Sequence, residues 1–240
     1  MRALVFRHDP GIGLGNLEAT LRAAGYEIET LDVAEEPGRL AELDATAPDL
    51  LVVLGGEEGA YETERYPYLA EELRIIRERA DAAAPVFGVC LGAQLTAAAL
   101  GARVFRGPAR ELGWVEVVPT DAGAASPVRH FAGVPVTQWH GDHFELPDGV
   151  ELLASSAAYP NQAFRRGREL LAVQFHHEVD RAIHEGWIER WGGGLRPGEP
   201  SVDELVDGRE RHLADAEAAS AALLGEWLAE LPAAARDAAA

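Results

Sequence analysis

The sequence predicts an α/β protein with a mostly parallel, open sheet flanked by helices, followed by antiparallel additions and a helical C-terminal extension. Three observations support this fold class. Short apolar runs alternate with helical patterns from residue 3 to residue 100. Two of these runs, 50–54 and 85–89, are almost wholly apolar, which is typical of strands buried on both faces. After residue 102 the runs shorten and lie between turn residues, as in antiparallel strands.

The first half of the chain supplies the alternation of strands and helices. In the first predicted helix, Leu17 and Leu21 lie about one turn apart, and Gly25 suits its C-terminal cap. We expect strands at 3–7, 26–33, 49–54 and 85–89, and helices at 16–24, 38–45, 68–83 and 91–100.

The second half contains five shorter β-type runs and then a change of composition. The runs are 113–118, 135–139, 150–155, 162–165 and 170–175. Residues 192–200 are rich in glycine and proline and predict a loop, and apolar residues at mostly helical spacing follow it. This remainder is too short for an independent core. We therefore expect a domain at 1–191 and an extension at 192–240, packed on that domain or on a partner, with a low-complexity, alanine-rich end.

The composition excludes several classes of function. Lys and Arg number 21 against 40 Asp and Glu, a net charge of −19 that would repel a phosphate backbone, so we expect no nucleic-acid partner. No apolar run approaches the roughly 20 residues that span a bilayer. The first residues, 1–7, indicate a strand rather than a signal peptide, so we expect a cytoplasmic protein. The sequence leaves its oligomeric state open.

The single cysteine, Cys90, lies between a predicted buried strand and a predicted helix, within Gly-Val-Cys-Leu-Gly at 88–92. Small residues there allow a sharp turn that presents a nucleophile to solvent. The helix N-terminus favours the thiolate, and its free N–H groups, beginning with that of Leu91, point to where an oxyanion would form. A buried, inert cysteine is the alternative.

A candidate base follows the last predicted strand, which ends in His176, His177 and Glu178. In an extended segment, His176 and Glu178 share one face while His177 points the other way. A carboxylate behind an imidazole fixes its orientation and stabilises the imidazolium, as a cysteine nucleophile requires. An exposed polar strand end is the alternative.

These two motifs resemble those of the class I (triad-type) glutamine amidotransferases. The nucleophile motif is Gly-Val-Cys-Leu-Gly-Ala-Gln at 88–94, and the His-x-Glu motif is Val-Gln-Phe-His-His-Glu at 173–178, where the family usually has proline at His177. The resemblance implies a flavodoxin-like sheet and a triad of Cys90, His176 and Glu178. It is closest to the glutaminase part of GMP synthases and its stand-alone relatives, because residues 138–147 are similar to that group's His-Gly-Asp stretch.

The same resemblance implies a substrate pocket. It makes the Gly56 N–H the second oxyanion donor, although Glu57 and Glu58 replace the more usual Pro-Met or Pro-Gly of that loop. It places Gln94 in the glutamine pocket and gives His140 and Asp142 a pocket or structural role. His140 and His143 also form a His-x-x-His pair, but no third ligand follows at a recognised spacing, so we expect no metal and no cofactor.

The function that these motifs imply is hydrolysis of the glutamine side-chain amide through a γ-glutamyl thioester, releasing ammonia to an unidentified acceptor. GMP synthases contain a Ser-Gly-Gly-Val-Asp phosphate loop, which this sequence lacks, so we expect that a synthetase or acceptor enzyme would be a partner chain. Two alternatives remain: a γ-glutamyl hydrolase acting on a γ-glutamyl amine or peptide, and a non-catalytic regulatory module with this fold.

Overall fold

An eight-stranded mixed sheet, in the order β2-β1-β3-β4-β10-β9-β8-β6, organises the protein. The structure is a computed structural model that describes residues 1–231, so the alanine-rich end predicted to be of low complexity lies outside the described residues. The first five strands in this order are parallel: β2 (Glu27–Asp32), β1 (Arg2–Arg7), β3 (Leu50–Val53), β4 (Val86–Val89) and β10 (Leu170–Val173). Every residue of β3, β4 and β10 is buried, as their apolar sequences predict.

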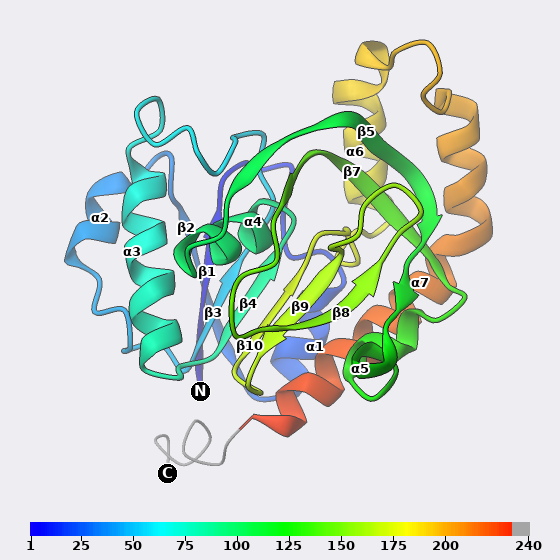
Figure 1. Ribbon diagram of the computed structural model, residues 1–240. Coiled ribbons are helices and arrows are strands. Elements are labelled where there is room, and N and C mark those ends of the chain that lie inside the picture. Colours follow the sequence, from blue (N-terminus) through cyan, green and yellow to red (C-terminus); the bar gives the residue numbers. More distant parts are fainter. Residues whose placement is uncertain (232–240) are drawn as a thin grey trace.

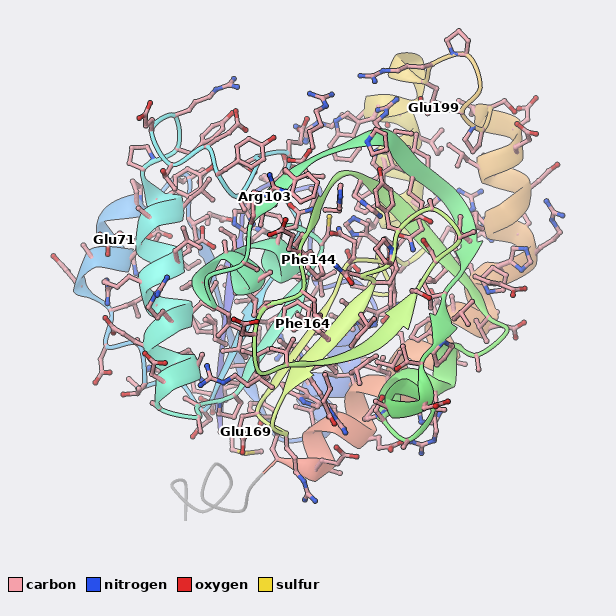
Figure 2. All side chains as sticks on the ribbon, viewed as in Figure 1. Glu71, Arg103, Phe144, Phe164, Glu169 and Glu199 are labelled. Carbon is pink, nitrogen blue, oxygen red and sulfur yellow. The ribbon has the colours of Figure 1, made fainter. Side chains whose placement is uncertain are left out.

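The remaining strands extend the sheet in antiparallel fashion. They are β9 (Ala163–Arg166), β8 (Glu151–Ser155) and β6 (Val118–Pro119). A separate two-stranded ribbon, β5 (Val104–Glu116) and β7 (Pro135–Phe144), arches over this half of the molecule (Figure 1). Phe144 at the end of β7 packs edge-on against Phe164 of β9, with ring centroids 5.3 Å apart (Figure 2). The ribbon therefore shares a core with the main sheet.

Helices cover both faces of the parallel strands (Figure 1). Alternate residues of β1 divide between the faces: Ala3 and Val5 pack with α1 (Leu17–Ala23) and α7 (Val202–Glu230), whereas Leu4 and Phe6 pack toward the other side. That second face is covered by α2 (Pro37–Glu42), α3 (Tyr68–Asp81) and α4 (Leu91–Ala99). The short elements are α5 (Asp121–Ala124), η1 (Pro127–Phe131), α6 (Arg181–Trp191) and η2 (Gly192–Gly194).

The predicted fold class is confirmed, with differences confined to the second half. The strand predicted at 113–118 combines the end of β5 with the first residue of β6, and the prediction missed the earlier part of β5. An irregularity between Arg106 and Glu111, which includes Gly107 and Pro108, hides the continuity of this long strand. The strand predicted at 135–139 continues to Phe144 through Gly141, which had the appearance of a turn. Helix α6 was not predicted, although the Asp180 side chain caps it by accepting the Ile183 N–H at 2.8 Å.

Helix α7 is an integral layer of this architecture. It begins with a capping box at Ser201 and Glu204, and it packs against α1, η1 and β5. Leu223 and Leu224 are buried in the same cluster as Leu17 and Leu21 of α1. The helical extension thus completes the core on one face of the sheet.

Within residues 1–231, no helix has the length and apolar character to cross a membrane.

Candidate active site

Cys90 lies at a strained turn between β4 and α4. Its φ of 52° and ψ of −106° place a non-glycine residue in a region that L-amino acids rarely adopt, at a cost of about 1–3 kcal/mol. Gly92 makes the turn possible, since a Cβ there would lie 2.0 Å from the Val53 carbonyl oxygen. Gly88 is also constrained, because a Cβ there would lie 2.7 Å from the Gly92 carbonyl oxygen. The predicted glycines are therefore steric requirements of the turn.

His176 and Glu178 follow β10, the strand beside β4, and reach the same edge of the sheet as Cys90. The His176 N–H donates to the Thr137 carbonyl at 2.8 Å, in a bridge that joins the β7 ribbon to the main sheet. His176 Nδ1 donates to Glu178 Oε1 at 2.6 Å, and its ring is also hydrogen-bonded to the Cys90 side chain. The structure thus brings Cys90, His176 and Glu178 together in a buried row.

The electrostatics of this row favour the charged imidazole. Burial by itself would lower the pKa of His176, but the negative charges of Cys90 and Glu178 and the hydrogen bonds to both outweigh it. The net result is a His176 pKa well above its ordinary value of 6.5. The geometry therefore supports an imidazolium held between a sulfur and a buried carboxylate.

His177 faces away from the thiol, as the alternation predicts. Its Nδ1–H donates to the Ser220 hydroxyl of α7 at 2.8 Å, and that hydroxyl donates to Asn16 Oδ1 at 2.8 Å. The Asn16 side-chain amide donates to the His177 carbonyl at 2.8 Å, and the Asn16 backbone N–H donates to the Glu178 carbonyl at 3.0 Å. The chain around Glu178 is consequently tied to both α1 and α7.

The Gly55–Gly56 loop follows β3 and lies directly beside the row. A Cβ on Gly55 would lie 3.1 Å from His176 Cε1, and one on Gly56 would lie 2.6 Å from Leu91 Cδ2. The two glutamates that follow are anchored: Glu57 pairs with Arg190 at 2.7 Å, and Glu58 accepts the Tyr68 hydroxyl at 2.6 Å. Leu91 lies at the first turn of α4 with its side chain in the core, so only its backbone is available to a ligand.

Gln94, His140 and Asp142 meet on the ribbon side of the site. The Gln94 amide donates to the Asp142 carbonyl at 3.2 Å, and His140 Nδ1 donates to the same oxygen at 3.0 Å. Behind them lies a buried carboxylate that the sequence did not reveal. Glu111 accepts from His140 Nε2 at 3.1 Å and from the Gln162 amide at 2.6 Å. These contacts fix the ribbon against α4.

A cavity of about 550 Å³ opens in front of Cys90. Cys90, Gly56, Gln94, His140, Asp142 and His176, all predicted site residues, line it. Three tryptophans form another part of its wall, with ring centroids 5.7–6.2 Å apart: Trp139 of β7, and Trp187 and Trp191 of α6. Trp187 and Trp191 lie about one turn apart in α6, a spacing that indicates a helix face but not a place at this site.

The loop after α6 borders the same cavity through Gly194. Arg110, another lining residue, holds this loop by donating from Nε to Glu199 Oε1 at 2.8 Å, near the top of the view in Figure 2.

Among residues 1–231, no three His, Cys, Asp or Glu side chains are grouped so that they could hold a metal ion. His143 instead packs its ring against Phe105 and Tyr159.

The fold and this site define a family. The chain belongs to the class I glutamine amidotransferases, because residues 14–189 match the family model described as "Glutamine amidotransferase class-I". The resemblance drawn from the motifs is thereby confirmed.

Individual relatives agree with this assignment. The chain is 36% identical over 146 residues to the glutamine amidotransferase-like protein YfeJ of Salmonella typhimurium, covering 59% of this chain and 61% of that protein. It is 34% identical over 182 residues to the glutamine-hydrolyzing GMP synthase of Streptomyces avermitilis, covering 70% of this chain and 32% of that enzyme. The matches thus span less than two thirds of either relative's length.

A solved structure matches nearly the whole chain. The crystal structure of a glutamine amidotransferase from Thermotoga maritima superposes with a TM-score of 0.84 at 33% identity, covering 95% of this chain and 98% of that one. The match includes the extension beyond residue 189.

The buried His177 predicts a specific pH dependence of stability. Burial lowers its pKa to about 4, so between that pH and about 6.5 the unfolded chain binds a proton that the folded chain does not. Stability must therefore rise with pH across this window, by up to about 3 kcal/mol from this residue. In His177→Asn, urea unfolding from pH 4 to pH 6.5 should show a shallower rise than in the wild type.

Ser220→Ala provides the matched control, because it removes the same hydrogen bond but keeps the imidazole. It should retain the wild-type slope at lower overall stability. Equal slopes in His177→Asn and the wild type would contradict the assignment of a neutral, buried His177.

Proposed function

We propose that this protein hydrolyses the side-chain amide of glutamine with Cys90 as nucleophile, His176 as general acid and base, and Glu178 as the group that orients His176. The observation that carries the proposal is the buried row itself. Cys90 lies on a strained turn, its side chain is hydrogen-bonded to His176, and His176 is held by Glu178 at 2.6 Å. A nucleophile, a base and an orienter in this arrangement suit acyl transfer.

The reaction would proceed in two steps. The Cys90 thiolate attacks the amide carbon, the imidazolium of His176 gives its proton to the leaving nitrogen, and ammonia departs to leave a γ-glutamyl thioester. Water then loses a proton to His176 and attacks the thioester, so glutamate leaves and the thiolate is restored. We assign the two oxyanion donors to the N–H groups of Gly56 and Leu91, each worth about 3–4 kcal/mol in the transition state.

The rest of the cavity would hold the amino-acid part of the substrate. Gln94 and His140 both donate to the Asp142 carbonyl, which supports a role for these residues in shaping the glutamine pocket. We propose residues 1–191 as the catalytic unit and the extension from 192 as its support, since Gly194 lines the cavity and Glu199 holds Arg110, another lining residue. The GMP synthase relative supports a synthetase or other acceptor enzyme as the partner that receives the ammonia.

Substitutions in the row test the chemistry. Cys90→Ala should abolish ammonia release from glutamine, and His176→Ala and Glu178→Gln should each lower kcat by at least about 10²-fold. Ammonia production and covalent labelling by diazo-oxo-norleucine, a glutamine analogue, are the two measurements. Glu169→Gln, at the opposite end of β10, is the matched control and should behave as the wild type.

These measurements also distinguish the regulatory alternative. If the analogue never labels Cys90, even with cell extract present to supply an activating partner, the protein is a non-catalytic module with this fold. Full glutaminase activity in Cys90→Ala would contradict the proposed nucleophile.

The size of the cavity gives the γ-glutamyl hydrolase alternative a specific basis. The space of about 550 Å³ extends from Cys90 to the aromatic wall at Trp191, so an amine larger than ammonia could leave toward the tryptophans. A panel of glutamine and γ-glutamyl amides of increasing size separates the two functions through kcat/KM. We expect glutamine to be preferred. A preference of tenfold or more for the larger amides, lost in Trp191→Ala, would establish the hydrolase instead.

A further inference from the structure

A buried ionisable pair lies behind the Gly55–Gly56 loop, outside the row just described. His8 directly follows β1, and Glu72 lies on α3; both side chains are completely buried. His8 Nε2 lies 3.2 Å from both carboxylate oxygens of Glu72, and His8 Nδ1 lies 3.0 Å from the Gly55 carbonyl oxygen. Neither side chain lines the cavity in front of Cys90.

The contacts determine the hydrogen positions on His8. A carbonyl oxygen can only accept, so Nδ1 must carry the hydrogen that bonds to Gly55. Nε2 faces the carboxylate of Glu72, and an imidazolium is the form that can donate in both directions at once. Burial acts to lower the pKa of His8, but the charge of Glu72 and the hydrogen bond to it outweigh burial and raise that pKa.

The same contact orients the peptide that follows. Residues 1–231 contain no cis peptide bond, so the Gly55 carbonyl and the Gly56 N–H point in opposite directions across one planar unit. The carbonyl is directed to His8, on the side away from the cavity, while Gly56 itself lines the cavity with Cys90. Within residues 1–231 the Gly56 N–H donates to no backbone acceptor, which leaves it free for a ligand.

Close packing prevents this peptide from moving freely. A Cβ on Gly56 would lie 2.9 Å from His8 Cβ and 2.6 Å from Leu91 Cδ2, so the backbone fits tightly between His8 and the first turn of α4. A rotation of the peptide would break the His8 hydrogen bond and leave a buried imidazolium with an unused donor. The pair therefore opposes any orientation that turns the Gly56 N–H away from the cavity.

We propose that His8, held by Glu72, is a positioning residue that fixes the Gly55–Gly56 peptide with the Gly56 N–H directed at the oxyanion of the reaction. The inference rests on the proposed glutaminase function and assigns to a pair outside the cavity the preorganisation of one oxyanion donor.

Two reactions of Cys90 distinguish the positioning role of His8 from a general effect on the reactivity of the thiol. Cleavage of glutamine passes through a tetrahedral oxyanion, whereas alkylation by iodoacetamide forms the S–C bond and expels iodide without one. His8→Leu should lower kcat for glutamine about 10²-fold with little change in KM, while the alkylation rate of Cys90 stays within about twofold of the wild type. His8→Asn places an amide donor near the Nδ1 position and should recover most of the lost kcat.

Two further variants serve as controls for His8→Leu. His130→Leu removes a histidine from a similar His–carboxylate pair with Glu226, far along the chain and partly exposed, and should change neither rate. If His8→Leu fails to fold because Glu72 is left unpaired, the double variant His8→Leu/Glu72→Leu removes both polar groups and should show the same selective loss.

The outcomes separate the two claims. Wild-type kcat in His8→Leu or in the double variant, or equal losses of cleavage and alkylation, would overturn the positioning role alone. A wild-type protein that is alkylated at Cys90 but never cleaves glutamine, with or without a partner, would contradict the proposed function, and the positioning role would fall with it.

Discussion

The backbone turn at Cys90 exists because α4 approaches the end of β3 more closely than any side chain permits. The contact between Gly92 and the Val53 carbonyl leaves no room for a Cβ, and the Cys90 N–H donates to the Val173 carbonyl of β10 at 2.9 Å. Three adjacent strands thus hold one strained residue. The position of the thiol, its hydrogen bond to His176 and the place of the Leu91 backbone all follow from that turn.

A second constraint acts on the other side of the row. The segment that carries Glu178 is tied by Asn16 to α1 and, through Ser220, to α7, which lies beyond the region matched by the family model. His177, where the family usually has proline, is the residue that makes the connection to α7. Through this contact, Ser220 of the extension gives the buried imidazole of His177 a polar partner in the core.

Local sequence patterns were sufficient for the parallel strands, the turn at Cys90 and the shared face of His176 and Glu178. These features depend on alternation and on glycines within a few residues, so they can be deduced from one segment at a time. Glu111 and Trp187 could not be found in this way. Their place at the site depends on how the β5–β7 ribbon and α6 fold back over α4, and this long-range packing leaves no mark within a short window.

The Gly55–Gly56 loop shows the same limit of local sequence patterns. His8 looks like an ordinary polar residue at a strand end, and its contact with Glu72 of α3 spans 64 positions of the chain. Only the strand order β1-β3-β4, which places the ends of these strands side by side, brings His8 behind the loop that faces Cys90. The site is therefore a product of the sheet's topology, as is usual at the carboxyl ends of parallel strands.

The central claim is that a γ-glutamyl thioester forms on Cys90. Partitioning with hydroxylamine during turnover of glutamine tests it most directly, because a thioester can be captured by this nucleophile in place of water. The account predicts that γ-glutamyl hydroxamate appears at the expense of glutamate as hydroxylamine is raised, and that Cys90→Ala forms neither product. Glutamate as the sole product at every hydroxylamine concentration, or hydroxamate formation that persists in Cys90→Ala, would contradict it.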